Sequence, residues 1–94
     1  LVIFKMEKFV GFGEYCEEAI IKREPFREQH LNRLKNLKDR DILITLGPTK
    51  CTKYLFGIFN AIDENELRDL IEQDIYWNKG IWVNYNIYPW VQAF

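Results

Sequence analysis

The sequence contains few residues of the types that bind metals or form disulfides, with one histidine and two cysteines among 94 residues. A structural zinc site takes four ligands, mostly cysteine and histidine at short, regular spacings. Cys16 and Cys51 lie far apart in the sequence and belong to no such motif. The ligand count therefore excludes a structural zinc site, and we expect neither a metal nor another cofactor.

Neither sign of charge predominates, because 13 lysines and arginines are matched by 14 aspartates and glutamates, for a net charge of −1. A nucleic-acid-binding domain usually has a marked basic surface, so nucleic acid is not an expected partner. Long apolar runs are also missing. The run at residues 1–4 is far shorter than the roughly 20 residues of a membrane span, so we expect no membrane contact.

The beginning of the sequence does not have the apolar core of a signal peptide, because Lys5, Glu7 and Lys8 interrupt it. Two unpaired thiols without an export signal favour a reducing compartment, and we expect a cytoplasmic protein. Hydrophobic residues make up 48% and charged residues 29% of the chain, as in ordinary globular proteins. A chain of this length has room for one core, so we expect a single domain over residues 1–94.

Hydrophobic periodicity predicts six elements along the chain. The first half has a strand over residues 1–12 that ends near Gly11–Gly13, a helix over 16–40 that is interrupted at Pro25, and a strand over 42–46 that ends at Gly47–Pro48. The second half has a strand over 54–60, a helix over 63–74 with Asp63 as N-cap and Glu66 completing a capping box, and a strand over 81–90. This β-α-β-β-α-β order predicts a ferredoxin-like α+β fold.

Two helices cover only one face of a four-stranded sheet, yet both faces of the predicted strands are apolar. In the strand over 54–60, Tyr54, Phe56 and Ile58 alternate with Leu55, Gly57 and Phe59. In the last strand, Trp82, Tyr88 and Trp90 are expected opposite Ile81, Val83, Tyr85 and Ile87. We therefore predict a homodimer in which two sheets pack face to face. The alternative is that the C-terminal aromatic residues fold back over the sheet within one chain.

The single histidine is placed on the apolar face of its helix. At 100° per residue, His30 lies within the arc of Phe26, Leu34 and Leu37. An imidazole that points inward is either a candidate general acid or base or a core histidine with both nitrogens satisfied by hydrogen bonds. Both interpretations remain open from the residues alone.

Asp74 follows Ile71 by three residues and Leu70 by four, so continued helix aims its carboxylate at the sheet. Both helices cover the same face, and His30 and Asp74 are therefore expected to meet or to share a pocket. A carboxylate that contacts an imidazole fixes its tautomer and supports its use as a base. The alternative is that Asp74 only bonds to the local backbone at the end of its helix.

Arg27 and Arg23 lie on the same side of the helix as His30, one turn and two turns before it, respectively. A guanidinium near an inward histidine binds an anionic group of a substrate. The alternative is that both arginines extend to solvent and only their stems are buried. Cys16 and Cys51 have no base nearby in the sequence, so we expect structural or incidental roles for them.

Short motifs between residues 22 and 90 occur in a characteristic order. They are Lys22-Arg23, Arg27-Glu28-Gln29-His30-Leu31 with Leu34, Gly47-Pro48, Asp74-Ile75-Tyr76 with Gly80, and Pro89-Trp90. Over about residues 8–94 their order and spacing resemble the YCII-related (YciI-like) domain family. Ile75 departs from the family pattern, which has proline after the aspartate, and the link over residues 49–53 is short for the family.

The resemblance implies one YCII-related domain over residues 1–94, with a ferredoxin-like subunit that dimerises into an α+β barrel. It also implies a His–Asp active site at His30 and Asp74. The family is similar in fold to muconolactone isomerase, and one of its branches is a dehydrochlorinase acting on a chlorinated hydroxyhydroquinone. The family's proline before the tyrosine is replaced here by Ile75, and this replacement is expected to affect the orientation of the Asp74 side chain.

From these residues we expect a small cofactor-independent enzyme of the lyase or isomerase type, acting on a small anionic or phenolic molecule. His30 is the expected acid and base and Asp74 its orienting partner, while Arg27, Arg23 and Tyr76 are expected to bind the substrate. The first alternative is a non-enzymatic dimeric module that binds a small molecule in the same pocket. A second alternative is a structural dimer without a ligand.

Overall fold

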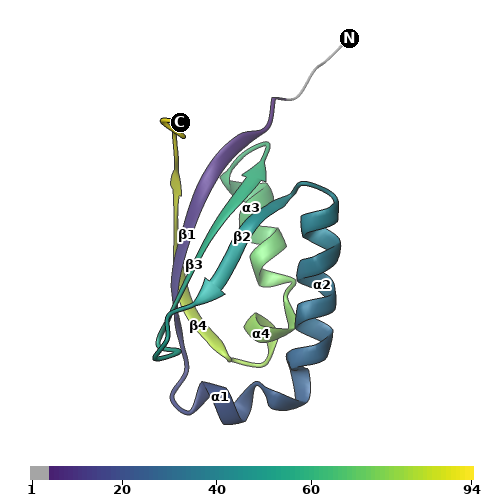
Figure 1. The fold of residues 1–94 in the computed structure, drawn as a ribbon, viewed down its shortest axis with the longest axis vertical. Helices are drawn as coiled ribbons and strands as arrows, with labels where there is room; N and C mark the ends of the chain where they lie inside the picture. The colour runs from purple at the N-terminus through teal and green to yellow at the C-terminus, as the bar shows by residue number, and fades with distance from the viewer. Residues whose placement is uncertain (1–4) are drawn as a thin grey trace.

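Four antiparallel strands form one sheet, in the order β2-β3-β1-β4, in the computed structural model, which describes residues 5–94. The strands are β1 (Glu7–Tyr15), β2 (Leu43–Pro48), β3 (Tyr54–Ala61) and β4 (Trp82–Pro89). The helices are α1 (Ala19–Lys22), α2 (Arg27–Asp39), α3 (Glu64–Glu72) and α4 (Ile75–Asn78), with a short 3₁₀ turn, η1 (Glu24–Phe26). Figure 1 shows α2, α3 and α4 on one side of the sheet and α1 at the end of the sheet. The predicted α+β class is confirmed, and the strand order is compatible with a ferredoxin-like fold.

The first strand extends further than the sequence predicted. It begins at Glu7 and continues through Gly11 and Gly13 to Tyr15, and the predicted part over residues 1–4 lies outside the described residues. Gly13 does not end the strand but allows close packing within it. A Cβ at this position would lie 2.4 Å from the backbone oxygen of Asn84 on the neighbouring strand. The glycine is therefore required by the β1–β4 contact rather than by a turn.

The first predicted helix is divided into three pieces. Residues 16–18 are not helical, and Glu18 adopts a left-handed backbone conformation with φ of 57°. Pro25 lies within the first turn of η1 and separates α1 from α2. Proline is accepted there because the first backbone N–H groups of a helix have no intrahelical acceptor. The predicted interruption at Pro25 is confirmed, whereas the predicted beginning of the helix at residue 16 is wrong.

The second predicted helix begins as expected but ends earlier. Asp63 is its N-cap, and the Asp63 carboxylate accepts a hydrogen bond from the Glu66 backbone N–H at 2.9 Å. Helix α3 ends at Glu72, so the prediction that it continues to Asp74 is wrong. Asp74 instead begins α4, where it is the N-cap. At one edge of the sheet, β2 does not end before Gly47 and Pro48 as predicted but continues through both residues. A proline is tolerated there because it lies at the end of an edge strand.

A bulge in β4 changes the predicted faces of this last strand. Glu14 pairs with Asn84 and Tyr15 with Trp82, so the extra residue is Val83. Trp82 therefore lies on the helix-covered face and is 4% exposed, while Val83 is 48% exposed. The predicted placement of these two residues is wrong, since alternation along a strand is lost where an extra residue is inserted.

The hydrophobic core lies between the sheet and the helices. It includes Phe9, Phe59, Leu67 and Ile71, all of them buried. The opposite face of the sheet is not covered by any described element and is also largely apolar, as predicted. We call it the open face, and it carries Val10, Phe12, Tyr54, Phe56, Ile58 and Tyr88. None of the helices in the described part of the chain has the length and apolar composition needed to cross a membrane.

Candidate active site

The structure brings His30 and Asp74 into direct contact. His30 on α2 is 4% exposed, Asp74 is fully buried, and the imidazole Nδ1 lies 2.7 Å from the carboxylate Oδ1. An ionised carboxylate only accepts hydrogen bonds, so Nδ1 carries the proton in this pair. The other ring nitrogen, Nε2, then keeps its lone pair. This is the tautomer in which an imidazole acts as a base through Nε2.

Asp74 reaches His30 by a different route from the one the sequence indicated. It has an extended backbone, with φ of −72° and ψ of 141°, and its Oδ1 also accepts from the backbone N–H of Tyr76 at 2.9 Å. The N-cap geometry of α4, rather than a continuing helix, thus turns the carboxylate inward. Asp74 both caps a helix and contacts His30, so the two interpretations of its role in the sequence are not exclusive.

Arg33 completes the group and was missed by the sequence analysis. Its Nη1 donates to Asp74 Oδ2 at 2.9 Å, and its Nη2 donates to the Leu70 carbonyl oxygen at 2.7 Å. Both carboxylate oxygens are therefore hydrogen-bonded, which offsets the cost of burying the charge. The signal in the sequence is that Arg33 follows His30 by three residues, a spacing that puts both side chains on one face of a helix.

Two aromatic side chains hold the imidazole in place. The Tyr76 ring stacks on His30 with 3.6 Å between ring centroids and 10° between planes. Trp82 approaches His30 edge-on, with centroids 5.2 Å apart and an interplanar angle of 86°. Tyr76 is 2% exposed and Trp82 is 4% exposed. The imidazole is thus fixed on one face by a phenol ring and at one edge by an indole.

A cavity of about 150 Å³ opens beside the imidazole. Its polar lining consists of Tyr15, Arg23, Arg27, His30 and Tyr76. Four of these are sequence-predicted site residues, and the fifth, Tyr15, had been given no role. Asp74 does not line the cavity, which is consistent with a positioning role behind His30.

The two arginines differ in their surroundings. Arg27 is exposed, whereas Arg23 is half-buried and its Nε is a buried atom without a hydrogen-bond partner in the described part of the chain. Neither guanidinium takes part in an ion pair among residues 5–94, where the ion pairs are those of Asp74 with His30 and Arg33. Two unneutralised positive charges therefore lie at the cavity, and they favour an anion there.

The model of the YCII-related domain family matches residues 8–91. The chain belongs to this family. In fold, it is similar to a solved 5-chloro-2-hydroxyhydroquinone dehydrochlorinase (TftG) from Burkholderia phenoliruptrix AC1100, in complex with 2,5-dihydroxybenzoquinone. The TM-score is 0.79 at 20% sequence identity, over 92% of this chain and 95% of the dehydrochlorinase. No curated protein matches the sequence.

In this YCII-related domain, the residue that departs from the family pattern leaves the Asp74 geometry intact. Ile75 is the first residue of α4, a position where proline is also favoured. The Asp74 carboxylate accepts from the N–H of Tyr76, not from that of residue 75. The cap therefore does not depend on which of the two residues follows the aspartate.

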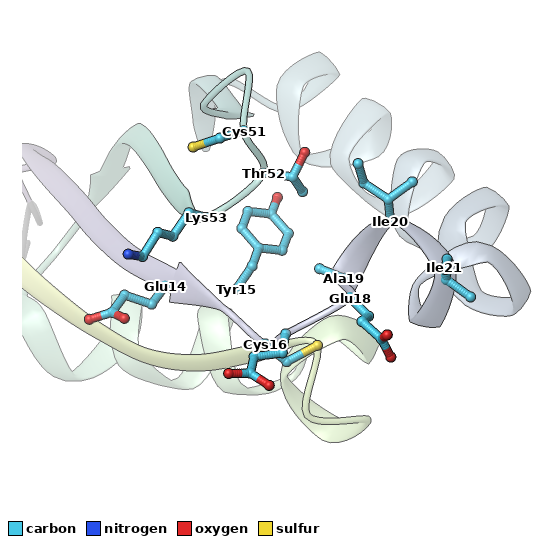
Figure 2. A pocket seen from close by; sticks show the side chains of 11 residues that line it. Glu14, Tyr15, Cys16, Glu18, Ala19, Ile20, Ile21, Cys51, Thr52 and Lys53 are labelled. Carbon is cyan, nitrogen blue, oxygen red and sulfur yellow. The ribbon is translucent and has the colours of Figure 1, made fainter.

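A larger pocket of about 670 Å³ also has Tyr15 in its lining. Figure 2 shows the Tyr15 ring at its centre, between the turn with Cys51 and Thr52 and the beginning of α1. Cys16 and Cys51 both line the pocket and are free thiols. The Thr49 hydroxyl lies 3.2 Å from the Cys51 sulfur, and this contact is the main cause that lowers the pKa of Cys51.

No cluster of three or more histidine, cysteine, aspartate and glutamate residues that could hold a metal ion occurs in residues 5–94 of the YCII-related domain. The polar groups that line the cavity are cationic or neutral donors, together with one imidazole. This arrangement is suited to proton transfer at His30 Nε2 next to a bound anion.

Proposed function

We propose that this YCII-related domain is a small acid–base enzyme of the lyase or isomerase type. Its substrate is a small anionic or phenolic molecule, and the reaction begins with a proton transfer to His30. One observation carries the proposal: the buried contact of 2.7 Å between His30 Nδ1 and Asp74 Oδ1, beside a cavity with two unpaired guanidinium groups.

His30 is the catalytic residue in this proposal, because it is the member of the pair that lines the cavity. Its Nε2 takes a proton from the substrate, and the substrate's electron pair moves onto an adjacent oxygen or expels a leaving group. Returning the proton to another atom of the same molecule gives an isomerase. Losing the proton together with an anionic leaving group gives a lyase.

Asp74 and the arginines support this step in different ways. Asp74 is a positioning residue that keeps the Nδ1–H tautomer and stabilises the imidazolium that forms during the reaction. Arg23 and Arg27 bind the negative charge that the substrate carries or develops on its oxygen. Tyr76 fixes the plane of the imidazole by stacking on it. The similar dehydrochlorinase, described in complex with 2,5-dihydroxybenzoquinone, suggests hydroxylated and halogenated rings as the first substrates to test.

The test compares turnover on halogenated hydroquinones, lactones and small keto acids for the wild type, His30→Gln and Asp74→Asn. Removal of a general acid or base typically costs about 10²–10⁴-fold in rate, so His30→Gln is expected to lose nearly all activity. The matched control is Asp69→Asn on the exposed side of α3, which removes the same charge far from the cavity. Unchanged turnover in His30→Gln contradicts the proposal.

The same panel separates the enzyme from the binding-module alternative. A molecule that raises the melting temperature without being converted, in the wild type and in Asp69→Asn alike, supports the binding module. Nitrogen-15 chemical shifts of His30 provide a second readout. In the wild type they are expected to report the Nδ1–H tautomer, and in Asp74→Asn a mixture of tautomers.

We also propose that the domain is a homodimer formed by two open faces. The open face has large exposed apolar side chains, with Phe12 and Phe56 each 43% exposed and Tyr88 58% exposed. Lys8 and Glu14 lie at opposite ends of the same face of β1. A two-fold axis between the sheets, running across β1, brings Lys8 of each copy opposite Glu14 of the other. The face is therefore complementary to itself in charge as well as in apolar character.

A further inference from the structure

Tyr15 is the residue of the cavity that neither the sequence motifs nor the proposed reaction uses. It ends β1, is 8% exposed and lines the cavity together with His30. Alternation along β1 is unbroken from Phe9 through Gly11 and Gly13 to Tyr15, and it places the Tyr15 side chain on the helix-covered face. The extra residue Val83 in β4 pairs Tyr15 with Trp82. The regular alternation of β1 thus delivers a phenol to the cavity.

The cavity has hydrogen-bond donors to spare and few acceptors. Its side-chain donors are the two guanidinium groups of Arg23 and Arg27 and the phenols of Tyr15 and Tyr76. No aspartate, glutamate, asparagine or glutamine of the described residues lines it. The nearby carboxylate of Asp74 is already bonded to His30, Arg33 and a backbone N–H. The guanidinium groups offer a ligand only donors, and apart from His30 Nε2 the acceptors among the side chains are the two phenol oxygens.

One buried donor of the cavity has no partner. Arg23 Nε is buried, lacks a hydrogen bond within residues 5–94 and belongs to a residue that lines the cavity. Unpaired buried N–H groups are rare in folded proteins and need an explanation. A ligand with acceptor oxygens in the cavity supplies one.

Both phenols remain protonated near neutral pH. Burial raises the pKa of Tyr15, and the Trp82 indole and the Arg23 charge oppose this effect only in part. Burial also raises the pKa of Tyr76. Each phenol therefore keeps the O–H that it needs in order to donate.

The size of the cavity fits one ring, because cavities of about 150 Å³ accommodate benzene.

We infer that Tyr15 contacts the substrate as a hydrogen-bond donor, and that with Arg23 and Arg27 it selects a single-ring molecule whose polar atoms are anionic acceptor oxygens. This inference rests on the proposed function, and it adds a substrate-binding residue and a rule of selection. A carboxylate or phenolate oxygen satisfies the donors, whereas an amine or amidine leaves them unpaired and meets two positive charges. Leu31, Leu34, Leu46 and Pro48 form the apolar wall against which the ring packs.

The test uses three probes of nearly equal size and shape, benzoate, benzamide and benzamidine, in binding measurements by calorimetry. Benzoate offers only acceptors, benzamide offers both kinds of group, and benzamidine offers only donors with a positive charge. The expected order of affinity is benzoate, then benzamide, then benzamidine. Tyr15→Phe, which keeps the ring and its packing, is expected to weaken benzoate binding about 10- to 100-fold, as for a lost hydrogen bond to a charged group.

Tyr85→Phe is the matched control, because Tyr85 is a half-buried phenol on the helix-covered side whose hydroxyl donates to Glu72 rather than lining the cavity. This variant is expected to bind benzoate as the wild type does. Equal binding of the three probes, preference for benzamidine, or no binding of benzoate at millimolar concentration overturns the rule of selection. Unchanged benzoate affinity in Tyr15→Phe overturns the role of Tyr15.

These outcomes can be told apart from a failure of the proposed function. If His30→Gln abolishes turnover but Tyr15→Phe leaves benzoate binding unchanged, the enzyme proposal stands and the contact with Tyr15 does not. If benzoate binding depends on Tyr15 but no substrate is turned over by the wild type, the donor-rich cavity stands as a binding site and the acid–base reaction does not.

Discussion

Arg33 donates to the oxygen of Asp74 that the imidazole leaves free, with 2.9 Å between Arg33 Nη1 and Asp74 Oδ2. The same guanidinium donates to the Leu70 carbonyl oxygen at 2.7 Å, near the C-terminal end of α3. One side chain on α2 thus connects the buried carboxylate with a second helix. The bond also gives Asp74 a permanent cation, whatever the protonation state of His30.

Replacement of Arg33 is expected to destabilise the fold. Arg33→Met should lower the free energy of unfolding by about 1.5–3 kcal/mol, the range for hydrogen bonds to charged groups. Arg33→Lys should be intermediate, because lysine keeps the charge but lacks the fork that bonds to two acceptors. Urea denaturation measures both, with Lys35→Met on the exposed face of α2 as the control. A loss in Arg33→Met no larger than in the control contradicts the bridging role.

Because the Tyr76 ring stacks on His30, we expect stability to depend on the ring of Tyr76 rather than on its hydroxyl group. Tyr76→Phe keeps the ring, so stability should stay within about 1.5 kcal/mol of the wild type. Tyr76→Ala removes a buried ring and should cost about 3–5 kcal/mol. Chemical denaturation gives these values, and the ring-proton shifts of His30 report whether the stack persists. Equal losses in the two variants would show that the phenol oxygen, not the ring, is what matters.

The alkaline limit of stability is expected to depend on Tyr85. Burial, together with the hydrogen bond to Glu72, raises the pKa of Tyr85 from 10.0 to about 12. A raised pKa means that the folded state holds the proton more tightly than the unfolded state. The contribution to stability is therefore complete below pH 10 and is lost as the pH rises towards about 12.

Tyrosinate absorbance during an alkaline titration measures this directly, and denaturation at several pH values gives the stability. Tyr85→Phe should remove one late-titrating group and flatten the decline of stability between pH 10 and about 12. A Tyr85→Phe variant whose stability declines between pH 10 and about 12 as steeply as that of the wild type counts against the prediction.

The open face is expected to control assembly. Sedimentation of the wild type should give the mass of a dimer, and Phe56→Glu should give a monomer, because the exposed Phe56 ring lies among the apolar side chains of the open face. Ile21→Glu is the matched control, since Ile21 is 73% exposed on α1, away from the sheet. A monomeric wild type, or a dimer that survives in Phe56→Glu but not in Ile21→Glu, rules out this interface.

Periodicity and turn signals in the sequence were sufficient for the α+β order, the N-cap at Asp63 and the inward face of His30. They failed where the backbone departs from regularity. Trp82 was assigned to the wrong face because the extra residue next to it, Val83, cannot be recognised from alternation alone. The prediction that His30 meets Asp74 rested on a helix that ends two residues earlier, at Glu72.

The remaining parts of the site depend on the reach of side chains in three dimensions. Arg33 bonds to a residue 41 positions away, and its spacing of three residues from His30 is shared by Arg27, so spacing alone does not specify which arginine does so. Alternation along β1 places Tyr15 on the helix-covered face, but the helix side chains that it meets there are set by packing in three dimensions. The catalytic role of His30 and the binding roles of Arg23, Arg27 and Tyr76 stay predictions, since geometry places these residues together without measuring a reaction.

Tyr15 borders both the small cavity at the imidazole and the larger pocket that contains the two thiols. The same side chain therefore belongs to the walls of both pockets, so a substitution at position 15 alters both of them at once. The hydrogen bonds that join His30, Asp74 and Arg33 do not involve Tyr15.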